Sequence, residues 1–215
     1  MSNKDFLKEI IELYKIQQNS KNISENIIRG RSKSIAGEAE EIFAKFIESN
    51  NCRDCMYYID QPIQFGSTKR ICYPDIFILE NTGVISHLID IKMDIGWKRN
   101  EIFDFCSSLD RDVKNIQGIE TQFSIKIEKS KKQRISATFS QDLKYHVVIL
   151  SKKNSKVDVL EEHHKRVNNE LNSVDLYMLS DGVYLNDYDN IDTILGKLIV
   201  LDGEFQRFFN AIRQI

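Results

Sequence analysis

The chain has 215 residues, of which 41% are hydrophobic and 29% are charged. This composition is ordinary for a soluble globular protein, and with only two prolines and nine glycines the chain shows no sign of a disordered linker. The formal net charge of −2 excludes a uniformly basic nucleic-acid-binding protein, but it is compatible with local basic patches around an acidic active site.

The distribution of apolar residues argues against a membrane protein. No run approaches the roughly 20 apolar residues of a membrane-spanning helix. No apolar stretch suited to a signal peptide follows the polar start of the chain. We therefore expect a soluble protein of the cytoplasm.

Hydrophobic spacing in the first half of the chain predicts helices followed by strands. A turn is expected at Asn81-Thr82-Gly83, between two apolar runs. In chain order, the predicted elements are helices over 4–18 and 33–49, strands over 56–65, 72–80 and 84–92, and a helix over 98–117.

The second half continues this alternation. It predicts a hairpin over 120–139 with a charged tip at 130–133, a buried strand over 145–150, a helix over 156–172, a buried strand over 174–179 and a helix over 203–213. Alternating helices and strands favour an α/β fold with a central mixed sheet flanked by helices. We expect one domain, with an N-terminal helical extension (1–30), a catalytic core (31–118) and a remainder that completes the sheet (119–215).

Four cysteines raise the question of zinc. Cys52 and Cys55 form a CxxC pair, and Cys72 and Cys106 are the only further thiols that could complete a four-cysteine site. The second two lack the close spacing of a zinc ribbon or finger. Free, reduced thiols are therefore the favoured interpretation, with zinc as the alternative.

Two short motifs place acidic residues in otherwise apolar strands: Pro74-Asp75 and Asp90-Ile91-Lys92. Side chains alternate along a strand, so Asp90 and Lys92 point to the same face. The alternative without a functional role is that both aspartates are exposed and paired with lysines. A buried, unpaired aspartate is costly, however, so its presence in an apolar strand favours a functional role.

Whether Asp75 and Asp90 lie opposite each other depends on the length of the turn between their two strands. If Thr82 and Gly83 form a two-residue hairpin loop, Asp75 lies directly opposite Asp90, with Cβ atoms about 4.5–5.5 Å apart. A loop of odd length would break this parity unless a β-bulge restored it. Adjacent carboxylates repel each other. Mg²⁺ removes that conflict, because it takes oxygen ligands and suits one or two carboxylates plus a phosphate.

This arrangement resembles the PD-(D/E)XK nuclease superfamily, which has the restriction-endonuclease-like fold. The resemblance covers residues 31 to about 117 and implies a site for one or two Mg²⁺ ions. Asp75, Asp90 and the backbone carbonyl of Ile91 would bind the metal, and Lys92 would serve the attacking water.

The resemblance also extends to the helix before the sheet. Gly37-Glu38-Ala39-Glu40-Glu41 matches the G-x-x-x-E form seen in some type II restriction enzymes. On this basis Glu41 is the additional catalytic and metal-binding carboxylate. Glu38, one turn earlier on nearly the same helical face, is the alternative.

Basic residues are candidates for contact with DNA phosphates. They are Lys98 and Arg99 after the catalytic strand, Arg31 and Lys33 before the glutamate helix, and Lys126, Lys129, Lys131, Lys132 and Arg134 in the predicted hairpin. For any single one of them, a solvated surface position is the simpler explanation.

The family resemblance therefore implies a type II restriction endonuclease that cuts double-stranded DNA, leaves 5′-phosphates and acts as a homodimer on a symmetric site. Two alternatives remain open. One is a junction-resolving or repair nuclease of the same fold, and the other is a DNA-binding protein that keeps the fold without catalysis.

Overall fold

The computed structural model describes residues 1–19, 22–24, 26–28, 34–51, 53–64, 71–94, 101–128, 131–153 and 157–213. Within these ranges the helices are α1 (Asn3–Asn19), α2 (Ala36–Asn50), α3 (Ile102–Lys114), α4 (Val157–Glu170), α5 (Ile191–Lys197) and α6 (Asp202–Arg213). None of these described helices is both long enough and apolar enough to cross a membrane.

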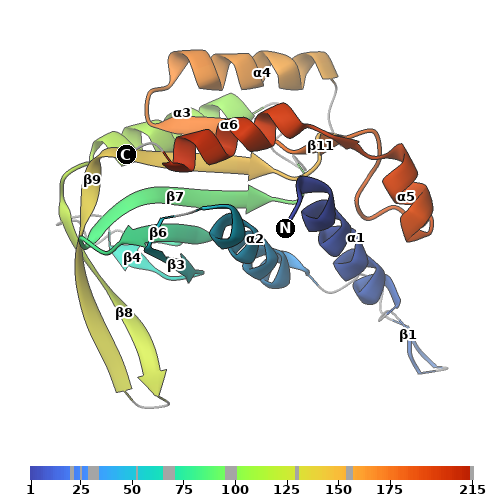
Figure 1. Ribbon diagram of the computed structural model, residues 1–215, viewed down its shortest axis with the longest axis horizontal. Helices are drawn as coiled ribbons and strands as arrows, with labels where there is room; N and C mark the ends of the chain where they lie inside the picture. The colour runs from blue at the N-terminus through green and yellow to red at the C-terminus, as the bar shows by residue number, and fades with distance from the viewer. Residues whose placement is uncertain are drawn as a thin grey trace.

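A curled, mixed sheet forms the centre of the molecule (Figure 1). Its strand order is β10-β9-β7-β6-β3, and β8 also pairs with β9. Pairing is antiparallel from β3 through β6 to β7 and parallel from β7 through β9 to β10. The strands are β3 (Cys55–Ile59), β6 (Ile76–Glu80), β7 (Val84–Lys92), β8 (Glu120–Glu128), β9 (Lys131–Ile149) and β10 (Val174–Met178).

Three small two-stranded sheets accompany the central one. They pair β1 (Asn22–Ser24) with β2 (Ile27–Ile28), β4 (Ile63–Gln64) with β5 (Ile71–Cys72), and β11 (Ser180–Asp181) with β12 (Ile199–Val200).

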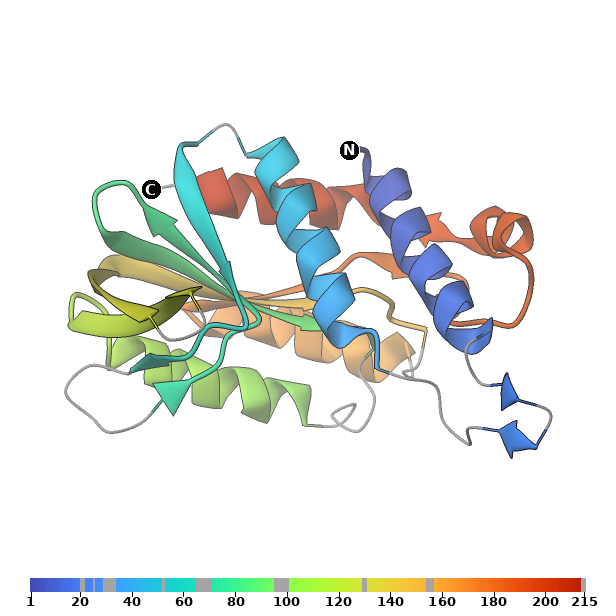
Figure 2. The ribbon, with the colours of Figure 1, turned by 90° about the horizontal axis from the view of Figure 1, so that it is seen from below.

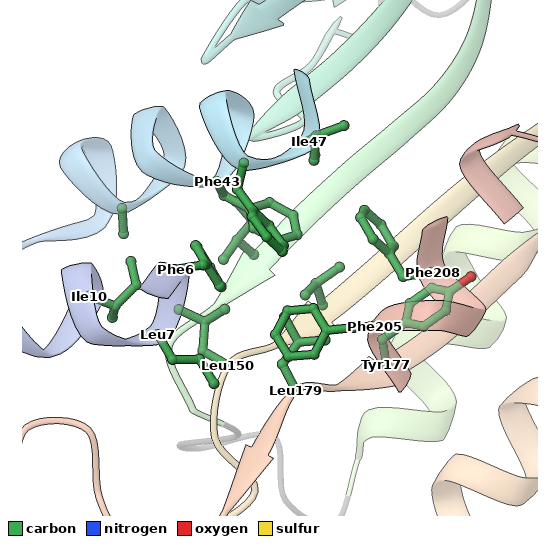
Figure 3. Packing of buried hydrophobic residues seen from close by; sticks show 14 of the residues in the cluster. Phe6, Leu7, Ile10, Phe43, Ile47, Leu150, Tyr177, Leu179, Phe205 and Phe208 are labelled. Atoms are coloured by element: carbon green, nitrogen blue, oxygen red, sulfur yellow. The ribbon is translucent and has the colours of Figure 1, made fainter. Parts of the chain in front are cut away.

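Helices cover both faces of the central sheet. In Figure 2, α1, α2 and α6 lie on one side of the strands, and α3 and α4 lie on the other. The first side buries a group of phenylalanines that includes Phe6, Phe43 and Phe208 (Figure 3). The second side buries Phe77 and Leu88 against the apolar residues of α3 and α4. The predicted α/β architecture is confirmed at this level.

Two predicted strands are each interrupted in the structure. The 56–65 run divides into β3 and β4 at Asp60, whose φ of 46° lies in the left-handed region. The 72–80 run divides into β5 and β6 before Asp75, where Pro74 has no N–H to give to a ladder. The two breaks lie side by side, because the Asp60 N–H donates to the carbonyl of Asp75 at 2.9 Å.

β9 is much longer than the predicted 145–150 strand. It runs for 19 residues, and its first part pairs with β8 in the predicted hairpin. Figure 1 shows this hairpin leaving the sheet as a projecting arm. The alternating polar residues of the arm concealed its continuity with the apolar 145–150 run, because one half is solvated and the other is buried.

The outer edge of the sheet at β10 is closed by side chains. The Asn168 amide of α4 donates to the carbonyl of Leu176 at 3.1 Å and accepts from its N–H at 3.0 Å. Arg207 of α6 also donates to that carbonyl. Glu204 accepts from the Met178 N–H at 3.3 Å. These bonds replace a neighbouring strand and satisfy backbone groups that an edge strand otherwise leaves unpaired.

Asn168→Ala is therefore expected to destabilise the protein by about 1–3 kcal/mol, because it leaves the Leu176 backbone groups without their amide partner. Urea denaturation measures this change. Asn169→Ala is the matched control, since Asn169 is exposed on the same helix and should stay within about 0.5 kcal/mol of the wild type. Equal effects of the two substitutions would contradict the edge-closing role.

Candidate active site

The β6–β7 hairpin brings Asp75 and Asp90 together, but by a different turn from the expected one. Leu79 pairs with Ile85, which leaves Asn81, Thr82 and Gly83 as a loop of three residues beyond the Glu80 and Val84 ends of the strands. Gly83 has a φ of 81°, and its N–H donates to the Glu80 carbonyl at 2.8 Å. A residue without a side chain adopts this left-handed conformation at little cost.

A β-bulge then restores the parity that the odd loop would break. The register shifts between Leu79↔Ile85 and Ile78↔His87, so Ser86 is the extra residue on β7. Beyond the bulge the pairing continues to Ile76↔Ile89. Its next position sets Asp75 opposite Asp90, which is the predicted opposition. The expected two-residue loop was wrong, and the bulge compensates for the difference.

The two strands direct the acids toward the same face. Ile76, Ile89 and Ile91 belong to the core beneath α1, α2 and α6. The alternate residues Phe77 and Leu88 belong to the core beneath α3 and α4. Strand alternation therefore places Asp75, Asp90 and Lys92 on the α3 and α4 face.

Lys92 holds the two carboxylates together. Its Nζ lies 2.8 Å from Asp90 Oδ1 and 3.8 Å from Asp75 Oδ2. Asp75 Oδ2 also accepts a hydrogen bond from the Ile91 backbone N–H at 2.5 Å. The Asp90 side chain is only 10% exposed, whereas that of Lys92 is 42% exposed. The ammonium group therefore sits at the open side of a carboxylate pair that is largely buried.

The electrostatics of the pair are those of two acids sharing one site. Burial and the neighbouring Asp90 carboxylate raise the pKa of Asp75 to about 7, against the opposing effects of Lys92 and the Ile91 N–H. A carboxyl group with such a pKa is half-protonated near neutral pH. A cation placed between the two groups would favour the ionised form of both.

The carboxylate of α2 that interacts with Asp90 and Lys92 is Glu40, whereas Glu41, the residue expected from the motif, points to solvent. Burial and the carboxylates of Asp60 and Asp90 raise the pKa of Glu40, and Lys92 lowers it. Glu38 and Glu41 are exposed. Each residue turns the helix by about 100°, so Glu41 lies far around the helix from the buried Ala39.

The spacing of apolar residues along this helix could have predicted that Glu40 lies beside the buried face. Glu40, Phe43, Ala44 and Ile47 follow i, i+3, i+4 and i+7 spacing, and the three apolar members are buried. Glu40 therefore lies at the border of the buried stripe, where a carboxylate can reach the end of the sheet. The G-x-x-x-E match had favoured Glu41 by spacing from Gly37 alone.

Residues of α3 and β9 form the apolar surroundings of the acids. Burial and then Asp90 raise the pKa of Cys106 to about 12. Burial raises the pKa of Tyr145 well above its ordinary value, with smaller contributions from Asp90, Cys72 and Asp75. Cys106 and Tyr145 are themselves buried, and a buried setting strengthens electrostatic interactions.

The described cysteines, Cys55, Cys72 and Cys106, are not disulfide-bonded, while Cys52 lies outside the described residues. Over the described ranges, no three His, Cys, Asp or Glu side chains converge closely enough to be assigned as a metal-binding group. Asp75 and Asp90 remain a two-carboxylate donor set. Mg²⁺ needs no more than that, because it retains several waters and completes its shell with a substrate phosphate.

Most of the predicted DNA-binding residues cannot be placed relative to the acids. Lys98, Arg99, Arg31, Lys33 and Lys129 lie outside the described residues, and the side chains of Lys126 and Lys131 are not described. Lys132 and Arg134 are exposed on the arm. They border a hollow of about 370 Å³ that Gln61, Gln64 and Ile71 also line.

A buried histidine pair crosses the sheet on the opposite face from the acids. His87 Nδ1 lies 3.0 Å from His146 Nε2, and Tyr177 Oη lies 3.3 Å from His146 Nδ1. Burial lowers the pKa of His87 to about 4. His164 of α4 contacts Glu204 at 3.0 Å and is partly buried. Both groups tie helices and strands together and lie apart from the acids.

The raised pKa of Asp75 predicts a specific pH dependence of stability. The folded state holds this proton up to about pH 7, and the unfolded state only up to its ordinary value of 3.8. The resulting stabilisation is therefore complete below about pH 3.8 and is lost as the pH rises through 7. Asp75→Asn, which keeps an acceptor for the Ile91 N–H, should gain stability relative to the wild type between pH 5 and about pH 8.

Urea denaturation at several pH values between these limits measures the difference. Asp142→Asn, an exposed position on β9, serves as the control and should differ from the wild type by the same amount at every pH. A constant difference for Asp75→Asn would show that Asp75 is ionised throughout this range.

No protein-family model, curated protein or solved structure matches this chain. The resemblance to the PD-(D/E)XK nucleases therefore stays a prediction. It rests on Asp75, Asp90 and Lys92 and on their geometry.

Proposed function

We propose that this protein is a magnesium-dependent nuclease of the PD-(D/E)XK type that hydrolyses phosphodiester bonds in double-stranded DNA. The observation that carries the proposal is the convergence of Asp75, Asp90 and Lys92 on one face of two antiparallel strands, with Nζ 2.8 Å and 3.8 Å from the two carboxylates. A central mixed sheet flanked by helices supports a restriction-endonuclease-like core.

The donor set fits the metal. Asp75 and Asp90 supply two adjacent carboxylates, and the Ile91 carbonyl follows directly on the same strand. Glu40 of α2 interacts electrostatically with Asp90 and Lys92, but among the described residues it does not converge with the two aspartates as a third ligand. When bound, Mg²⁺ would polarise the scissile phosphate and lower the pKa of a water.

Each residue of the site has a separate role in this mechanism. Asp75 and Asp90 would hold the cation that offsets the negative charge of the reacting phosphate. Lys92, whose ammonium group is partly exposed, holds the attacking water by hydrogen bonding and balances the negative charge that develops on phosphorus. The Ile91 N–H fixes the Asp75 carboxylate, so that its position is set by the backbone of β7.

The partner is DNA on this proposal. The exposed Lys132 and Arg134 of the arm are suited to contacting phosphates outside the reacting position. Cutting both strands of a symmetric site calls for two copies related by a two-fold axis, so a homodimer belongs to the type II restriction form of the proposal.

Asp90→Asn and Lys92→Ala should each reduce Mg²⁺-dependent cleavage of mixed plasmid and phage DNA by at least about 10²-fold, because each removes a group that acts on the reacting phosphate. Asp104→Asn, an exposed position on α3, is the control and should cut like the wild type. Gel electrophoresis with and without Mg²⁺ measures the products. Cleavage that survives Asp90→Asn would rule out this site.

The same assay separates the subclasses. Discrete bands indicate a sequence-specific restriction enzyme, and a smear indicates non-specific cutting. Preferential cutting of four-way junctions or mismatched duplexes indicates a resolving or repair nuclease. Intact DNA with every substrate, together with retained DNA binding, would favour a non-catalytic DNA-binding protein.

Metal binding can be tested without cleavage. Mg²⁺ at about ten times its Kd should raise the Tm of the wild type by about 3–6 °C, because a ligand of the folded state stabilises by mass action. Asp90→Asn should abolish most of this rise. NaCl at equal ionic strength is the control. Identical shifts in the wild type and in Asp90→Asn would place any bound Mg²⁺ elsewhere.

A further inference from the structure

The hollow beside the projecting β8–β9 arm carries positive charge without a neutralising acid. It measures about 370 Å³ and lies between the arm and the β4–β5 pair. Its charged members are Lys132 and Arg134, which are both exposed and alternate along β9 so that they share one face. None of the described residues that line it is acidic, so the two charges are not balanced inside it. Such a lining favours an anionic ligand.

The wall of the hollow that faces the arm is close to the acids. Gln61 and Pro62 line it and directly follow Asp60, whose N–H donates to the Asp75 carbonyl at 2.9 Å. Ile71, which also lines it, is four residues before Asp75, so their Cα atoms are at most about 14 Å apart. The hollow is therefore a near neighbour of the carboxylate pair.

The hollow also adjoins the core on the acid-bearing face of the sheet. Phe123 lines it, and Ile63 lies in the chain between two of its lining residues. Both belong to the core beneath α3 and α4, which is the face that carries the acids. Thr121 of β8 donates to the Gln64 carbonyl at 2.5 Å. This bond ties β4 to the arm, so the two walls of the hollow are held together.

The donors of the arm are spaced to hold a segment of a phosphate backbone. Lys132 and Arg134 are two residues apart on one strand, which sets their Cβ atoms roughly 7 Å apart. Arg134 pairs across the ribbon with Ser124, another member of the lining, whose hydroxyl is a further donor. A guanidinium group binds a phosphate through two parallel hydrogen bonds, and an ammonium group adds a point charge.

A larger hollow of about 680 Å³ continues along the same ribbon. It shares Gln64 and Gln122 with the first hollow. Threonine and serine hydroxyls contribute to its lining, and Glu120 is the one acid among its described members. An extended ligand can therefore run from one hollow into the next. A phosphodiester chain fits this continuity better than a free phosphate ion does.

We infer that the hollow of Lys132 and Arg134 holds a non-reacting phosphate of the DNA backbone, a few nucleotides from the phosphate that is cut. The inference rests on the proposed function for the identity of the substrate. Successive phosphates of one strand advance about 3.4 Å along a duplex, so a span of about 14 Å corresponds to roughly four nucleotides. Phosphate contacts carry no sequence information, so the hollow fixes the position of the DNA and leaves its recognition sequence to other residues.

Two substitutions of the same kind test the hollow. Gln122→Glu places a carboxylate in the lining, whereas Gln133→Glu places one on the opposite face of the same ribbon, outside the lining. Affinity for a labelled duplex of mixed sequence is measured by fluorescence anisotropy without divalent metal, so that no cleavage intervenes. Gln122→Glu should weaken binding about tenfold, because two negative groups would share the hollow, and Gln133→Glu should stay within about twofold of the wild type.

The salt dependence of binding gives a second readout. Arg134→Gln should reduce the magnitude of the slope of log Kobs against log[NaCl] by about 1, because one phosphate contact is lost. Lys165→Gln removes the same charge from an exposed position on α4, which lies on the side of the molecule away from the arm (Figure 1). This control should keep the wild-type slope.

Equal weakening by the two glutamate substitutions, an unchanged slope in Arg134→Gln, or failure of the wild type to bind the duplex would overturn the inference. The cleavage assay with Asp90→Asn decides the proposed function independently. DNA that is held through the hollow but never cut refutes the nuclease alone. Mg²⁺-dependent cutting with neither effect at the hollow refutes the phosphate site alone.

Discussion

The repulsion between the Asp75 and Asp90 carboxylates is the constraint to which the surrounding structure is fitted. Two acids on neighbouring strands, one of them almost wholly buried, would drive the hairpin apart without compensation. Lys92 and the Ile91 N–H supply part of that compensation, while burial and the Asp90 carboxylate still raise the pKa of Asp75. A site that keeps such a pair in place has a standing preference for positive charge.

This constraint accounts for the irregular features nearby. The Ser86 bulge determines which face of β7 Asp90 occupies, since a register change of one residue would turn it into the opposite core. Asp60 and Pro74 end the neighbouring strands at the acids, which leaves that end of the sheet accessible. Glu40 approaches the same point from α2. The two strand breaks, at Asp60 and Pro74, therefore lie beside Asp75.

Much of this arrangement was predictable from the sequence because it depends on local periodicity. Strand alternation gave the common face of Asp90 and Lys92, and apolar spacing gave most helices. The hairpin loop was not predictable in detail, because a three-residue loop plus a bulge and a two-residue loop place Asp75 at the same position. The choice between Glu40 and Glu41 depends on the packing angle of α2, and a motif spacing does not contain that angle.

The short elements were missed for a different reason. α5 and the β11–β12 pair are held by contacts with distant parts of the chain, such as the bond between the Leu201 N–H and the Leu179 carbonyl. The partners of the buried histidines likewise come from separate strands. Residues that meet only after folding leave no periodic trace in the sequence.

The amide of Asn168 has a consequence for the protein in a crowded cell. The Leu176 N–H and C=O are already hydrogen-bonded to Asn168. An extended chain that meets the β10 edge therefore cannot pair with them, and stacking of strands into a fibre cannot start there. Asn168, together with Arg207 and Glu204, thus closes the β10 border of this mixed sheet to an added strand from another copy.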